Sequence, residues 1–456
     1  MDNDKQILEG KIGKAILSFF FPILLGTFFQ QLYNTVDAVI VGRFAGKTAL
    51  SSVGGSSAIL VNLVVGFFTG LSSGCTVLVA NYFGSGEKKK LEEVLHTTYA
   101  FGILGGVSLG GLMVYLVPEL LRLMKTDPEL MGESTTYLRV YFAGLLFVFI
   151  YNLGAGILRA LGDSRRPLIY LIICTGVNIV FDLLFVLGLR KGVFGVALAT
   201  LIAQGISSVL VTLRLIRGAS GVVLTLRRIR IVPSSLLRIL KIGLPAGIQS
   251  SCYAISNLFI QTAINTFGVN TIAGWTAEGK VDCIFWMINA SFGVAATTFV
   301  GQNYGAGKRE RVRKGTRVCL LMSVSSALLV STVLYTAGGF ILRLFTKDPD
   351  VLSIGTGMLR YIVPFYVFFA FIEIFSSALR ARGDTFFPTV INLTAIVGFR
   401  LVWIRHFFGT TDIYRILRCY PLSWILCAVL MTLYYLGYTF LEKRHQERSG
   451  KYITES

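Results

Sequence analysis

A stripe of polar residues crosses the first long apolar run of the sequence, at 15–41. Its four members follow the spacing i, i+3, i+4, i+7 and are Gln30, Tyr33, Asn34 and Asp37. This spacing places them on one face of a helix. A carboxyl group inside an apolar helix is costly unless it is protonated, hydrogen-bonded or bound to a cation. The stripe is therefore predicted to face a cavity or another polar helix, with Asp37 able to take up a proton or Na⁺.

A second carboxyl group lies in the run 168–188, where Asn178 and Asp182 are four residues apart and share a helix face. No Lys or Arg falls in the middle of the apolar runs of the first half, so neither Asp has a basic partner there. Carboxylate, amide and hydroxyl oxygens favour Na⁺ over transition metals. These residues indicate proton or Na⁺ coupling. The alternative is a structural Asp that is hydrogen-bonded to backbone, Ser or Thr at a helix end.

The second half of the chain carries a different polar set. Asn257 and Gln261 lie on an uncharged stripe in the run 238–266. Glu373 is the one deep acid, and the residue 221 positions before it is Asn152. We expect these four side chains to line a substrate cavity or to act as secondary polar groups.

Two further charged groups of the second half have competing interpretations. Glu278 and Asp282 share a helix face, and Lys280 between them could offset one carboxylate, so we interpret this cluster as partly structural. Arg400 and Arg405 could pair with Glu373 or extend to the membrane surface.

Composition narrows the class of protein. The 456 residues are 54% hydrophobic and only 15% charged, whereas soluble domains carry about 25% charged residues. A soluble enzyme and a disordered chain are both excluded, and a polytopic membrane protein remains. The seven Cys and three His show no metal-ligand spacing, so we expect no disulfide framework and no metal site other than Na⁺. The net charge of +19 is interpreted as an orientation signal and not as a nucleic-acid surface.

Twelve apolar runs are long enough to cross a membrane as helices, which takes about 20 residues. They are 15–41, 52–80, 95–117, 135–158, 168–188, 193–213, 238–266, 272–300, 316–342, 355–379, 387–408 and 418–440. Of the 43 Lys and Arg residues, 28 lie in the loops and termini on one side. The positive-inside rule places that side, with both termini, in the cytoplasm.

The two halves of the sequence repeat each other at an offset of 221 residues from Val79 onward, and of 223 residues at Pro22 and Pro245, which requires a two-residue gap. Asp127-Pro128 matches Asp348-Pro349, and Gly162-Asp163 matches Gly383-Asp384. The Asp-Pro pairs are typical of helix N-termini and the glycines of helix C-caps. Six spans in each half give parallel repeats, an arrangement that suits alternating access. We expect an all-α fold in two six-helix lobes. The predicted boundaries are 1–217 (N-lobe), 218–237 (basic cytoplasmic linker), 238–441 (C-lobe) and 442–456 (cytoplasmic tail).

The linker mixes arginines with Val and Leu. It is either an amphipathic segment on the inner leaflet or a plain charged connector.

Three motifs carry a resemblance to a known family: the repeated R-A-x-G-D-[S/T] turns, the stretch from Gly301 to Gly307, and P-x(7)-Q-x-L-Y-N-x-x-D-x-x-x-V-G from Pro22 to Gly42. Over essentially its whole length the chain resembles bacterial multidrug and toxic compound extrusion (MATE) transporters. The resemblance implies two six-helix lobes around a central cavity, and export driven by inward H⁺ or Na⁺. It also implies an N-lobe cation site, whose residues here are Asp37, Asn178, Asp182 and Thr200, with Tyr33 one turn before Asp37.

Some members of this family also use acids on the seventh and tenth spans. Glu373 matches the tenth-span position, and the seventh span here has no acid.

The sequence therefore predicts a monomeric secondary active exporter of cationic amphipathic molecules in a bacterial cell membrane, working by antiport of Na⁺ or H⁺, without a cofactor and in contact with membrane lipids. A lipid-linked precursor flippase of the same superfamily is the main alternative. An intramembrane enzyme would need a His/Asp/Glu or Ser/His cluster at one depth, and none is visible. A passive channel is disfavoured by the two-lobe repeat.

Overall fold

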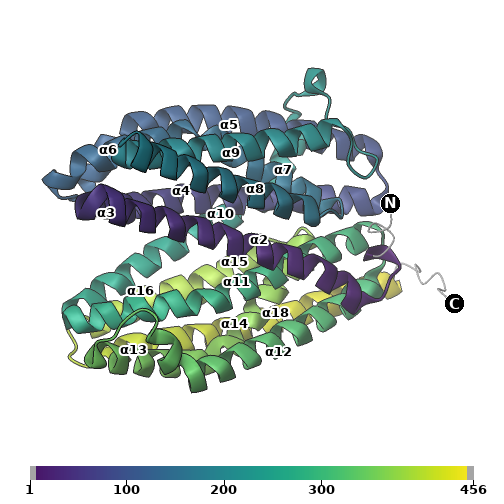
Figure 1. Cartoon of the computed structure of the whole chain (residues 1–456). Coiled ribbons are helices and arrows are strands. Elements are labelled where there is room, and N and C mark those ends of the chain that lie inside the picture. The colour runs from purple at the N-terminus through teal and green to yellow at the C-terminus, as the bar shows by residue number, and fades with distance from the viewer. Residues whose placement is uncertain (1–6, 449–456) are drawn as a thin grey trace. The chain divides into compact units, whose positions relative to one another are not determined.

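The computed structural model describes residues 7–448, and helices form nearly all of them (Figure 1). The only β-type pairing in this range is an isolated bridge between Ala219 and Val222. Long apolar segments adopt helices in lipid because every backbone N–H and C=O must find its partner within the segment. The all-α prediction is confirmed.

The chain forms two compact units. Unit 1 contains Met1–Ala254 and Thr297–Arg313, and unit 2 contains Ile255–Ala296 and Lys314–Ser456. The lobes 1–217 and 238–441 are sequence-based divisions and stay predictions. Of the predicted tail 442–456, only the part up to Arg448 lies within the described residues.

Unit 1 is a bundle built on the first six predicted spans. Its helices are α2 (Ile12–Ile40), η1 (Val41–Ala45), α3 (Gly46–Gly54), α4 (Ser56–Ser85), α5 (Lys88–Leu123), α6 (Pro128–Ala143), α7 (Leu145–Ala160), α8 (Arg165–Asp182), η2 (Leu183–Gly188), α9 (Gly192–Ile216) and η3 (Leu226–Arg228). Helix α8 packs against α2 and α9, and α7 packs against α4, α5 and α9. These contacts bring the first, fifth and sixth predicted spans together.

Three long helices run through both units: α10 (Pro233–Ile264), α11 (Val269–Gly305) and α12 (Arg309–Leu342). The remaining elements belong to unit 2. They are η4 (Asn265–Phe267), α13 (Pro349–Ile362), η5 (Val363–Phe365), α14 (Tyr366–Ala381), α15 (Phe386–Asn392), η6 (Leu393–Gly398), α16 (Phe399–Phe407), α17 (Ile413–Leu417) and α18 (Cys419–Arg448). Helix α18 packs against α14, α15 and α16.

By length and hydropathy, the described helices account for eleven of the twelve predicted membrane spans, and α10 is the exception. Among residues 7–448, ten continuous helical stretches are long and apolar enough to cross a membrane, and the bent pair α6 and α7 makes eleven if it counts as one span. The run predicted at 238–266 folds as α10, whose 32 residues reach about 48 Å. Most helices extend beyond the apolar runs because a run marks only the part in hydrocarbon.

Two runs expected to be continuous are broken in unit 1. The run 52–80 is divided at Gly55 between α3 and α4, and the run 135–158 is bent by 47° where Gly144 separates α6 from α7. In the second half, 221 residues later, η5 interrupts the corresponding run 355–379. The break between α6 and α7 is thus part of the repeat.

The predicted caps are confirmed. Asp127 Oδ1 accepts a hydrogen bond from the Glu129 backbone N–H at 2.9 Å, and Asp348 Oδ1 accepts one from Asp350 at the same distance. Gly162 and Gly383 have positive φ angles of 97° and 91°, which favour glycine.

The predicted linker 218–237 is only partly helical. It contains a tight turn at Gly218–Val222 and the single turn η3, and α10 already begins at Pro233. Val222 and Leu224 are buried in the core of unit 1.

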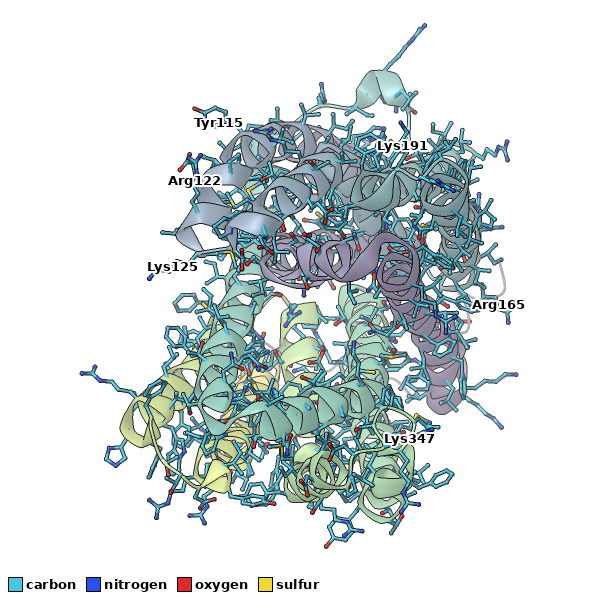
Figure 2. All side chains as sticks on the ribbon, turned by 60° about the vertical axis from the view of Figure 1, so that its left-hand side comes forward. Tyr115, Arg122, Lys125, Arg165, Lys191 and Lys347 are labelled. Atoms are coloured by element: carbon cyan, nitrogen blue, oxygen red, sulfur yellow. The ribbon has the colours of Figure 1, made fainter. Side chains whose placement is uncertain are left out.

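The end of α5 presents polar and aromatic groups outward. Figure 2 shows the side chains of Tyr115, Arg122 and Lys125 standing off the surface there, and Tyr115 is 78% exposed. Aromatic and basic side chains near a helix end are typical of a membrane–water interface.

Candidate functional site

Three packed helices of unit 1 position the predicted cation-site residues. Helix α2 carries Tyr33 and Asp37 near its end, α8 ends on Asp182 one turn after Asn178, and α9 carries Thr200. Turns of π-helix follow both acids: η1 begins four residues after Asp37, and η2 directly follows Asp182. Single π turns inside α-helices are rare and concentrate at functional sites.

The structure brings all five residues together. Asp37 faces both Asp182 and the Asn178 carboxamide, and the Tyr33 hydroxyl donates a hydrogen bond to Thr200 Oγ1 at 3.2 Å. Asp37 is 8% exposed and Asp182 is fully buried. Residues 167 positions apart in the chain are thus joined across α2 and α9.

Several buried carboxyl and amide atoms of this site lack hydrogen-bond partners. Within the described part of the chain, neither Asp182 oxygen, nor Asp37 Oδ1, nor the Asn178 side-chain oxygen or nitrogen has one. None of the ion pairs within residues 7–448 includes either Asp. Two carboxylates held together away from water would cost several kcal/mol per charge. A proton or a monovalent cation shared by them removes most of that cost.

Two tyrosines border the site and were not singled out by sequence reasoning. Tyr137 and Tyr141 on α6 both interact electrostatically with Asp37. Their rings stack on each other with centroids 6.1 Å apart. The spacing of four residues was a visible signal, but only the packing of α6 identifies Asp37 as their neighbour.

The other predicted residues of the first half lie elsewhere. Gln30 and Asn34 are exposed, so the α2 stripe divides between Tyr33 and Asp37, which face inward, and two residues that do not. Asn152 donates its side-chain N–H to the Val148 carbonyl at 2.8 Å on its own helix.

In the second half, Asn257 is exposed and Gln261 belongs to a local network. The Gln261 amide donates to Asn265 Oδ1 at 2.8 Å and accepts from the Trp275 indole at 3.1 Å. These bonds fix the end of α10 against α11.

Glu373 packs tightly against α11. Its Oε1 accepts a hydrogen bond from Ser377 at 3.3 Å. A Cβ atom added to Gly293 of α11 would overlap the Glu373 carboxyl group. Arg400 neither pairs with Glu373 nor extends to the surface, because its guanidinium is buried and donates to Ser423 at 3.1 Å. Arg405 is exposed.

No group of three or more His, Cys, Asp or Glu within residues 7–448 could hold a metal ion. All seven cysteines are free thiols.

An all-helical bundle of membrane-length helices, with an internal repeat and a buried pair of acids, defines a polytopic membrane transport protein. The MatE family model matches residues 22–184 and, a second time, residues 245–404. The chain belongs to the MatE family, whose members are transporters and not enzymes. The double match also confirms the predicted repeat.

Curated relatives and solved structures agree with this assignment. The chain is 30% identical over 387 residues to the probable multidrug resistance protein YpnP of Bacillus subtilis, covering 84% of this chain and 86% of the relative. It is 26% identical to the probable multidrug resistance protein NorM of Thermotoga maritima, covering 87% of each chain. An outward-facing multidrug resistance MATE transporter of the MOP superfamily shares the fold with a TM-score of 0.88 at 23% identity, over 95% of this chain and 97% of that one.

Proposed function

We propose that this chain is a secondary active exporter that moves small organic molecules, cationic amphipathic ones above all, out of the cell in exchange for Na⁺ or H⁺. The supporting observation is the pair Asp37 and Asp182, which is buried in unit 1 without a basic partner among the described residues. Relatives named as multidrug resistance proteins support the substrate class.

The coupling cation binds between the two carboxylates. The Asn178 carbonyl and the Thr200 hydroxyl add uncharged oxygen ligands when the cation is Na⁺, and Tyr33 holds the Thr200 hydroxyl in place. Cation binding removes the repulsion between Asp37 and Asp182, so that α2 and α8 pack more closely. Cation release restores the repulsion and favours the other arrangement of these helices.

Export follows from linkage between the cation and the substrate. If the bound cation favours the conformation that holds substrate weakly, then substrate must weaken cation binding by the same factor. Such couplings typically amount to 1–3 kcal/mol, or about 5-fold to 150-fold in affinity. Alternating access of the predicted lobes 1–217 and 238–441 then exchanges one ligand for the other. We propose a monomer in a bacterial cell membrane, surrounded by lipid, with both termini in the cytoplasm.

The test measures efflux of a cationic dye from vesicles under separate Na⁺ and H⁺ gradients. Wild-type efflux should follow one of the gradients, and D37N and D182N should abolish it with normal expression. The control is E119Q, because Glu119 is exposed and pairs with Arg122 at 2.6 Å on the surface; this variant should transport normally. Dye flux that ignores both gradients would favour a channel or a flippase and refute the proposal.

A further inference from the structure

A second pair of acids lies in unit 2, on α11, with Glu278 buried and Asp282 partly buried. Glu278 and Asp282 are one helical turn apart and interact electrostatically, and Glu278 is only 2% exposed. Lys280, which could have offset one of them, is exposed and forms no ion pair with either acid among the described residues. None of the ion pairs among residues 7–448 includes either acid.

The two acids have different surroundings. Asp282 accepts a hydrogen bond on each oxygen, from the Tyr366 hydroxyl and from the Trp286 indole N–H. Hydrogen bonds to an ionised acceptor are about twice as strong as neutral ones, so these two donors favour the carboxylate form of Asp282. Glu278 Oε1 is buried without a partner in the described structure. Asp282 is therefore stabilised as an anion, whereas no hydrogen bond compensates a negative charge on Glu278 Oε1.

The wall around the pair is largely aromatic. Phe285 stacks on Tyr366 with ring centroids 4.0 Å apart, and Trp286 contacts Trp424. The titratable and charged groups near the pair are Tyr366 of α14, Tyr420 of α18, Arg400 of α16, and Lys280 and Cys283 of α11.

Of the two basic residues near the pair, Arg400 is buried and Lys280 is exposed. The Arg400 guanidinium lies 4.2 Å from the centre of the Tyr420 ring. Its Nε donates to Ser423. This guanidinium therefore binds side chains of α18 and does not neutralise Glu278.

We propose that Glu278 and Asp282 form a second site for one small monovalent cation, a proton or Na⁺, with Asp282 as the fixed anion and Glu278 as the group that takes up and releases the cation. Two charges here without a counterion would cost several kcal/mol each. One bound cation leaves a single negative charge, which the two donors stabilise. The pair is on α11, the eighth predicted span, and not on the seventh or tenth.

This inference adds a site to the proposed function but does not depend on it. The Asp37 and Asp182 pair belongs to unit 1 and the Glu278 and Asp282 pair to unit 2. Cation binding at the second pair can therefore be measured without transport, and the chain would bind two cations in total.

The sequence supplies a reporter for the second site alone. All four tryptophans lie in unit 2, and none lies in the residues that form unit 1. They are Trp275, Trp286, Trp403 and Trp424. Because the Trp286 indole donates directly to Asp282, a cation entering the pair changes the environment of that ring. Intrinsic fluorescence should therefore follow occupation of this site.

The experiment uses the purified full-length protein in detergent. Tryptophan emission is recorded while pH is varied in Na⁺-free buffer, and separately while Na⁺ is raised at constant pH. Wild type should show one transition, in the pH arm if the cation is a proton and in the Na⁺ arm if it is Na⁺. E278Q should lose this transition, W286F should lose most of its amplitude, and D37N and E119Q should retain it.

A second variant keeps the test decisive if E278Q does not fold. Y366F removes one donor from Asp282 but leaves the ring stacked on Phe285. Asp282 stays an anion with and without the cation, so loss of this donor leaves its negative charge less compensated, and Y366F should bind the cation about tenfold more tightly. A transition that persists unchanged in E278Q, an unshifted transition in Y366F, or no response to either cation would overturn the proposal. Loss of dye efflux in D37N with an intact fluorescence transition would separate the two sites.

Discussion

Helices α4 and α11 cross at a point where adding a single methyl group should measurably lower the stability of the protein. A Cβ atom on Gly84 would lie 2.7 Å from the carbonyl carbon of Gln302 and closer still to its oxygen. Gly305 has the same relation to Asn81, so the contact is reciprocal. Gly84 corresponds to Gly305, and Asn81 to Gln302, at the 221-residue offset of the repeat. The crossing is a backbone-to-backbone contact that only glycine permits.

The G84A variant tests this crossing. The Gln302 carbonyl carbon would have to move by about 0.7 Å to reach an ordinary contact distance of 3.4 Å, and the carbonyl oxygen, which is nearer, by more. Overpacking of a rigid site costs about 1–3 kcal/mol, and replacing Gly by Ala in a helix returns at most about 1 kcal/mol. The net loss is about 1–2 kcal/mol, which for a chain of 456 residues corresponds to a fall in Tm of about 1–2 °C.

The assay is thermal unfolding of purified protein in detergent at one fixed heating rate, since unfolding of such proteins is often irreversible. G111A is the matched control, because nothing lies within 4 Å of a Cβ on Gly111 of α5, and it should be as stable as wild type or slightly more stable. G305A should behave like G84A, and the double variant should lose less than the sum of the two because both act on one contact. Equal Tm values for G84A and G111A would refute the reasoning.

Three further variants test local contacts. D348A removes the cap that binds the Asp350 N–H and should lower stability by about 0.5–2 kcal/mol in the same unfolding assay, whereas D348N should not. R311M should detach the carbonyl of Ile7, to which the guanidinium donates at 3.0 and 3.1 Å, and should speed proteolytic cleavage of the N-terminal segment; unchanged cleavage would contradict this contact. Y33F should lower the affinity for the coupling cation about 2-fold to 10-fold by freeing Thr200, measured by cation titration of dye efflux, with unchanged affinity as the contrary result.

The sequence predicts the helices well because their physical causes are local. Apolar runs mark the membrane spans, and Asp-Pro pairs mark helix starts, so Asp127 and Asp348 were identifiable as caps before any contact was known. The acid pair was also predictable in outline, because an unpaired Asp in an apolar helix needs a partner from another helix.

The remaining features depend on packing between distant segments. The break at Gly144 and the π turns after Asp37 and Asp182 have no local signature, since glycines and apolar residues are frequent throughout the spans. The hydrogen bond from Tyr366 to Asp282 joins residues 84 positions apart, and no rule based on residue spacing predicts such a contact. The contact of Arg400 with Ser423 was not among the two roles considered for it, because sequence gives its depth and not the direction of its side chain.

The central claim is that substrate and coupling cation compete through Asp37 and Asp182. The most direct measurement is the release of bound cation when a cationic dye is added to purified protein, followed as proton release in weak buffer and as displacement of radiolabelled Na⁺. Wild type should release cation in proportion to the dye bound, and D37N and D182N should bind dye with loss of that release. Equal release from wild type and D37N would contradict the account.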